Sequence, residues 1–162
     1  MAFKPHPNGG GLVEDTAFVA ETAYVGKYAV VRDNARVLDN AKIDDHAHVY
    51  GNAQIYGDAM VCHDAKVYGD AKVYGDGLVW CNAVVFDSAR VFDRAEVHGN
   101  AQVFDDVVVC GNARIYMDAK VYGNTTVYGN ARIFVNAKVY GDAQVFGDAH
   151  VSGDAQVDFD LI

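Results

Sequence analysis

Histidines are the side chains of this sequence most suited to catalysis or metal binding. A histidine can act as a general base beside an acceptor hydroxyl or amine, and a group of histidines can hold zinc through ring nitrogens. His46 and His48 flank Ala47, and His63 follows them, so these three are the set to test. The full set is scattered along the chain: His6, His46, His48, His63, His98 and His150.

Cysteines offer a second kind of chemistry, but their arrangement is unpromising. Cys62, Cys81 and Cys110 are an odd number, are widely spaced and form no C-x-x-C pair. We therefore expect small apolar residues in a reducing compartment, with no disulfide. The glycine run Gly9–Gly11 is too short for a phosphate-binding loop, and motifs for a catalytic nucleophile are absent.

Composition limits the partners. The 162 residues carry a net charge of -9, which disfavours nucleic acid and anionic membranes, because phosphate binding needs clustered lysine and arginine. No apolar run approaches the ~20 residues of a membrane helix. The opening MAFKPHPNGGG lacks the apolar core of a signal peptide, so we expect no secretion and a cytoplasmic or virion-associated protein.

A six-residue repeat organises nearly the whole chain. Valine or isoleucine stands at every sixth position from Val13 to Val157, and a small residue, mostly alanine, stands two positions earlier. Ala-x-Val places both side chains on one face of a strand, and the following aromatic-Gly-Asn/Asp triplet is typical of a turn. β-branched and turn residues oppose helix throughout. The pattern predicts a strand that bends regularly into stacked coils paired in parallel, with the number of sides per coil left open.

The unit V-x-G-N/D-A-x resembles the hexapeptide repeat. The resemblance implies an all-β, single-domain left-handed parallel β-helix, a triangular solenoid with three repeats per coil. Residues 13–157 then make about eight coils, roughly 40 Å long at ~4.8 Å per coil. Neither the Val/Ile track nor the small-residue track is broken, so we expect no inserted loop and no C-terminal helix. Residues 1–12 are the predicted lead-in or cap, and residues 158–162 are the predicted tail.

The resemblance also brings two enzyme hypotheses, acyltransferase and γ-class carbonic anhydrase. Such acyltransferases commonly carry a projecting loop and a C-terminal helical region, and the anhydrases carry three zinc-binding histidines with Arg-Gly-Asp and Gln-Asp stretches. This chain has none of the loops or stretches, and its histidines are scattered. We expect no catalytic residue, no metal and no cofactor. Calcium between stacked carboxylates such as Asp58 and Asp76 is the alternative to plain turn chemistry for the Asn/Asp positions, and Ser88 and Arg94 interrupt those columns.

Outward aromatic residues raise the question of binding. Stacked every eighteen residues, they form columns that either brace the rod or meet a partner. Two patches are the alternative predicted contact surfaces. Met60, Cys62, Leu78 and Trp80 should lie on adjacent coils of one face, and Val84 and Phe86 form the other patch. Trp80 is the predicted hot spot.

The function expected from these observations is a non-catalytic structural solenoid, a rigid rod or decoration and assembly module. The opening H-P-N-G-G-G-L-V followed by near-perfect repeats looks like uncharacterised bacterial and phage-encoded hexapeptide-repeat proteins, which suggests a virion or prophage setting. The expected partners are copies of itself, with a trimer implied by the resemblance, and a larger assembly such as a virion. A glycan- or protein-binding module using the aromatic faces is the alternative.

Overall fold

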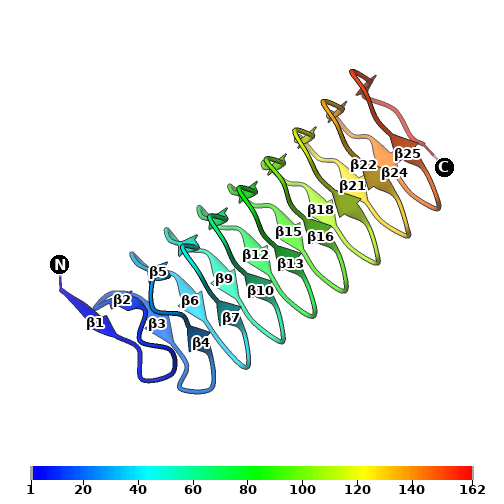
Figure 1. Cartoon of the computed structure of the whole chain (residues 1–162). Coiled ribbons are helices and arrows are strands. Elements are labelled where there is room, and N and C mark those ends of the chain that lie inside the picture. The colour runs from blue at the N-terminus through cyan, green and yellow to red at the C-terminus, as the bar shows by residue number, and fades with distance from the viewer. Residues whose placement is uncertain (1, 162) are drawn as a thin grey trace.

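Three β-sheets run the length of the molecule and wind around one core, with the two chain ends at opposite ends of a rod (Figure 1). The computed structural model describes residues 2–161; residues 1 and 162, which belong to the predicted lead-in and tail, lie outside the described residues. We call the three sheets faces A, B and C.

Each face is a ladder of very short strands. Face A contains β1 (Phe3–Pro5), β2 (Leu12–Glu14), β5 (Val30–Val31), β8 (His48–Val49), β11 (Lys66–Val67), β14 (Val84–Val85), β17 (Gln102–Val103), β20 (Lys120–Val121), β23 (Lys138–Val139) and β26 (Gln156–Val157). Face B contains β3 (Phe18–Val19), β6 (Arg36–Val37), β9 (Gln54–Ile55), β12 (Lys72–Val73), β15 (Arg90–Val91), β18 (Val108–Val109), β21 (Thr126–Val127) and β24 (Gln144–Val145). Face C contains β4 (Tyr24–Val25), β7 (Lys42–Ile43), β10 (Met60–Val61), β13 (Leu78–Val79), β16 (Glu96–Val97), β19 (Arg114–Ile115), β22 (Arg132–Ile133) and β25 (His150–Val151).

Strand pairing confirms the predicted parallel solenoid. From β2 to β23, each strand pairs in parallel with the strand three further along the chain. Met60 therefore lies opposite Leu78, and Val61 lies opposite Val79. Three repeats therefore make one eighteen-residue coil, as the side-chain bonds between residues 18 apart also show. About eight coils stack, and residues 2–161 contain no helix and no looped-out insertion. The left hand of the coil stays a prediction.

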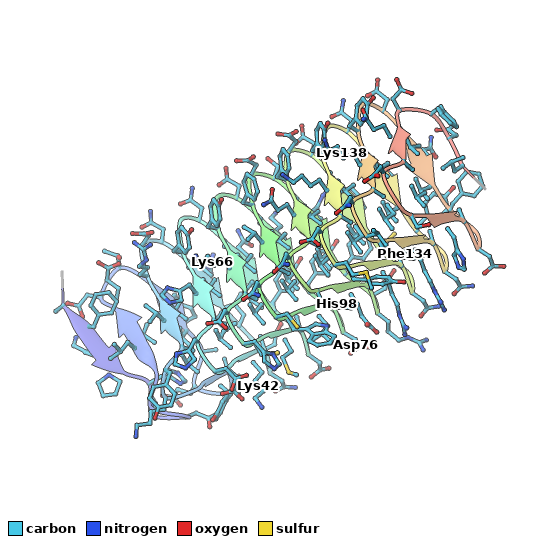
Figure 2. The ribbon with its side chains drawn as sticks, turned by 45° about the horizontal axis from the view of Figure 1, so that its top comes forward. Lys42, Lys66, Asp76, His98, Phe134 and Lys138 are labelled. Carbon is cyan, nitrogen blue, oxygen red and sulfur yellow. The ribbon has the colours of Figure 1, made fainter. Side chains whose placement is uncertain are left out.

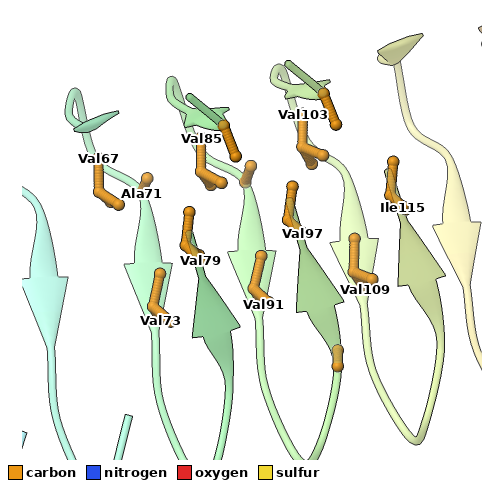
Figure 3. Close-up of a cluster of buried hydrophobic side chains, with 14 of the residues drawn as sticks. Val67, Ala71, Val73, Val79, Val85, Val91, Val97, Val103, Val109 and Ile115 are labelled. Atoms are coloured by element: carbon orange, nitrogen blue, oxygen red, sulfur yellow. The ribbon is translucent and has the colours of Figure 1, made fainter. Parts of the chain in front are cut away.

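Valine, isoleucine and alanine fill the core as the repeat predicts. Val67, Val85 and Val103 follow one another along one face, and Val79, Val97 and Ile115 along another (Figure 3). These side chains have no exposed surface. Burying each valine contributes about 1.5–3 kcal/mol relative to leaving it exposed, and this contribution recurs at every repeat.

The turns require a left-handed backbone at one position of almost every repeat. Glycine often occupies it; at Gly99, where φ is +71°, an added Cβ would lie 2.7 Å from the backbone nitrogen of Met117. Several other residue types adopt the same conformation, including Asp45, His63 and the β-branched Val135, with φ of +53°, +59° and +63°. A β-branched residue there is strained, because its Cβ crowds the backbone.

Asparagine and aspartate side chains tie each corner to the next coil. Asn82 donates its amide to Asn100 at 3.1 Å, and Asn100 donates to Asp118 at 2.9 Å. Aspartates at the left-handed position accept instead from the backbone, as Asp93 does from the N–H of Gly111 at 3.0 Å. The corner side chains thus stabilise coil stacking, whereas the sequence suggested only local turn chemistry.

The two ends of the rod are covered differently. At the N-terminal end, β1 pairs antiparallel with β2 on face A. On face C, the backbone N–H of Gly11 donates to the carbonyl of Val25 in β4. At the C-terminal end, Leu161 forms a parallel bridge to Val145 on face B. Among residues 2–161, the outer edges of β1, β3, β4, β25 and β26 have no strand partner, although Asn8 and Gly11 bond to the backbone of β4.

Candidate functional site

The aromatic columns are stacks of half-buried rings, continuous on face A and interrupted by Cys110 after face B. On face A, Tyr50 and Tyr68 stack with centroids 4.7 Å apart, and the column continues through Phe86 to Phe104 at 5.0 and 4.8 Å. In the column that follows the face B strands, the ring centroids of Tyr74 and Phe92 lie 4.7 Å apart, at an interplanar angle of 5°. Such offset stacks shield each ring with its neighbours. This arrangement favours the bracing role over a free contact surface.

The first predicted contact patch lies on face C. Met60 and Leu78 are opposite one another in β10 and β13 and are half-buried, and Cys62 is buried. The Trp80 ring stacks on His98 at 4.5 Å and tilts against His63 at 6.0 Å. Its Nε1–H is buried with no acceptor among the described residues, which is an unmet polar group.

The second predicted patch lies on a different face. Val84 belongs to face A, where it stands between Lys66 and Gln102, and Phe86 is held between Tyr68 and Phe104. Lys66 and Lys138 mark the outward surface of the same face (Figure 2). The six predicted contact residues therefore lie on two faces of the rod.

The histidines occupy separate environments. His46 stacks on Tyr28 at 5.1 Å, and His98 lies in the face C column that continues through Tyr116 to Phe134 (Figure 2). Burial lowers the pKa of His98 and of His48, since burial disfavours the charged imidazolium; Lys66 and Arg32 add to the effect on His48.

A shallow hollow of about 450 Å³ brings His46 and His48 together on face A. Its other lining residues are Asp64, Lys66, Asn82 and Val84. The hollow contains no His63, which lies in the neighbouring column of turn residues. The three histidines considered for zinc therefore do not converge.

Metal-binding side chains do converge at one other place. Among residues 2–161, the one group of three with ligand atoms all within 4.8 Å of one another is Asp45, Cys62 and His63. Neither Asp58 nor Asp76 belongs to such a group, so the calcium hypothesis gains no support. Comparing His63 with the other histidines alone misses this set, whereas a search for carboxylates and thiols at separations of 17 and 18 residues, one coil, finds it in the sequence.

Exposed apolar side chains gather at the ends of the rod. Among the described residues, the large apolar side chains that are exposed are Phe3, Leu12, Phe18, Tyr28, Met117 and Phe159. All except Met117 lie in residues 3–28 or in the tail. A hollow of about 350 Å³ beside β3 is lined by the lead-in and by Phe18. The six contact residues predicted from the sequence lie on the sides of the rod, and the apolar end of the tail is expected to allow end-to-end docking. Leu12 and Phe18 already stand out in the sequence as large apolar residues at outward positions.

A family model described as the YdcK beta solenoid repeat matches residues 53–69. The match spans just under one coil and agrees with the β-solenoid architecture. No curated protein matches the chain. No helix among the described residues is long and apolar enough to cross a membrane.

Proposed function

We propose that the chain is a non-catalytic structural rod that assembles through its ends, joining copies of itself head to tail. The observation that carries the proposal is the position of the exposed apolar side chains. Phe18 is 55% exposed at one end and Phe159 is 57% exposed at the other, whereas the aromatic residues along the sides are half-buried in their own columns. Exposed apolar groups gathered at one place mark contact surfaces.

The covering of the strand edges supports head-to-tail contact. The lead-in covers faces A and C at one end and the tail covers face B at the other. If the C-terminal end of one copy meets the N-terminal end of the next without rotation, every face has one covering segment between its two strand edges. One covering segment would therefore separate the two copies on each of the three faces, so the two ends could meet evenly.

Open backbone groups support the same contact. Parallel pairing uses hydrogen bonds in both directions, as at the C-terminal end, where Leu161 donates to Gln144 at 2.7 Å and Phe146 donates to Leu161 at 2.9 Å. The outer edges of β3, β25 and β26 therefore each present both N–H and C=O groups. Open edges of this kind are templates for pairing with another chain.

A rigid, regular body suits a spacer or assembly role. The coil repeats from β2 to β26 without an insertion, and side-chain bonds link successive coils at the corners. The resemblance to hexapeptide-repeat proteins, with its side-by-side trimer, and the virion or cytoplasmic setting remain further parts of this proposal that rest on sequence alone.

A binding module on face C is the second candidate. The half-buried indole of Trp80, with the apolar Met60 and Leu78 beside it, gives a partly apolar surface for a sugar ring or a partner side chain. This surface would also serve a side-by-side trimer. Both uses of face C predict that Trp80 and Met60 matter and that the ends do not.

Molecular mass against protein concentration separates the candidates. We expect the mass to rise stepwise with concentration, and Phe18→Glu or Phe159→Glu to hold it at the monomer value because a charge at the junction is desolvated. Removing residues 158–162 should do the same. Met60→Glu, on the side of the rod, is the matched control and should assemble normally. A concentration-independent mass, or assembly lost only in Met60→Glu, would overturn the end-to-end proposal.

A further inference from the structure

Two turn residues and a buried thiol meet at the corner that follows face C. Asp45 and His63 occupy the same left-handed turn position in successive coils, and Cys62 directly precedes His63. One ligand atom from each lies within 4.8 Å of the other two. The Asp45 Oδ2 atom lies 3.9 Å from His63 Nδ1 and accepts a hydrogen bond from the His63 backbone N–H at 3.2 Å.

We propose that Asp45, Cys62 and His63 bind one divalent transition-metal ion of the zinc class. Thiolate, imidazole and carboxylate are the three side-chain ligands that zinc uses, at about 2.0–2.3 Å, and a sulfur-nitrogen-oxygen set selects such an ion over calcium or magnesium. The side chains of Asp45 and His63 are 52% and 55% exposed, so the ion has access from solvent and room for water in its fourth position.

The backbone of the corner is fixed before any ion arrives. Cys62 donates its backbone N–H to Val79 in the next coil at 3.0 Å, and its carbonyl accepts from Ala65 at 3.4 Å. The indole of Trp80 lies against the His63 ring. Small side-chain rotations are therefore sufficient to bring the three ligand atoms to one ion, without rearrangement of the coil.

The chain contains its own comparison. Asp93 and Cys110 repeat the separation of Asp45 and Cys62, and Asp93 likewise accepts from the following coil. Gly111 stands there in place of His63, with the same left-handed backbone at φ +69°. Among residues 2–161 no three-ligand group forms at that corner. The corner at Gly111 thus has the carboxylate and the thiol without the imidazole.

The Cys62 sulfur must lose its proton to bind a metal ion. Burial, followed by the nearby carboxylates of Asp45 and Asp44, raises the pKa of the free thiol to about 11, so the ion has to displace that proton.

Cobalt(II) titration of the reduced full-length protein tests the proposal. We expect one ion per chain, a thiolate-to-cobalt charge-transfer band, and loss of the band when zinc is added. Cys62→Ser and His63→Gly should abolish the band, whereas Cys110→Ser should keep it. His63→Gly reproduces the corner at Gly111, so it is expected to fold, and circular dichroism checks this.

A second measurement does not depend on thiolate absorption. Zinc should raise the thermal unfolding midpoint of the unmodified protein and leave that of His63→Gly unchanged, because an ion that binds only the folded state stabilises it. Absence of the cobalt band, a band that survives in Cys62→Ser, or equal zinc stabilisation in His63→Gly would each overturn the proposal.

Discussion

Asn100 donates its side-chain amide to Asp118 in the next coil at 2.9 Å, and the ladder of side-chain bonds stops there, because a carboxylate has no hydrogen to pass on. The same rule ends the ladders at Asp70 and Asp148, each reached through asparagines. The choice between asparagine and aspartate at a corner therefore decides how far the ladder extends.

This relationship predicts opposite effects for two isosteric substitutions. Asn100→Asp removes the donor and places a second charge beside Asp118, so we expect it to lower the free energy of unfolding by about 1 kcal/mol, and by less in high salt. Asp118→Asn keeps the acceptor and supplies a donor toward the next coil, so it should be neutral or stabilising. Urea unfolding of both variants measures the difference; equal losses would contradict the ladder.

The strained backbone at Val135 predicts that replacing this residue with glycine stabilises the fold. Its φ of +63° crowds the Cβ of a β-branched residue, and glycine removes that crowding at some cost in chain entropy. We expect Val135→Gly to raise the free energy of unfolding by about 1 kcal/mol. Val108→Gly, at an outward strand position with ordinary backbone, should instead destabilise. Thermal unfolding compares the two, and a destabilised Val135→Gly would show that its turn is unstrained.

The aromatic columns predict a specific loss at Phe104. Its ring stacks between Phe86 and Tyr122 at 4.8 and 5.1 Å, so Phe104→Ala removes two stacked pairs. At about 0.5–1.5 kcal/mol for each pair, we expect a loss of roughly 1–3 kcal/mol. The control is Phe159→Ala, since Phe159 is exposed, and both variants are compared at a concentration at which the protein is monomeric. If both variants unfold at the same urea concentration, the columns do not brace the rod.

His98 predicts a loss of stability in acid. Burial between Trp80 and Tyr116 lowers its pKa in the folded state, so the unfolded chain binds a proton more readily. Stability from the neutral ring is therefore present above the ordinary pKa of 6.5 and is lost as pH falls below it. His98→Phe, which extends the column with another aromatic ring, should reduce this acid sensitivity. His150→Phe, at an exposed position, serves as the control in thermal unfolding at pH 5 and 7.5.

The fold followed from the sequence because its causes repeat locally. Each six-residue unit carries an inward Ala-x-Val pair and turn residues, so residues such as Val67 and Ala71 could be placed without knowing the rest of the chain. The three-sided coil came from the resemblance, since the period alone leaves the number of sides open.

The candidate sites were harder to predict because they combine residues one coil apart. Cys62 and Asp45 meet only when the coil length is known, and the bond from Asn100 to Asp118 depends on the same separation. Exposure at Phe18 and Phe159 depends on what the end segments cover, which no local pattern contains. Trp80, the predicted hot spot, lies between the rings of His63 and His98.

The axial repeat of the assembled protein tests the end-to-end rod most directly. Deleting residues 85–102 removes one coil and keeps every column in register, so X-ray scattering from the assembly should show a repeat shortened by about 4.8 Å, the spacing of neighbouring strands. An unchanged repeat, or a discrete trimer in place of an extended assembly, would contradict the account.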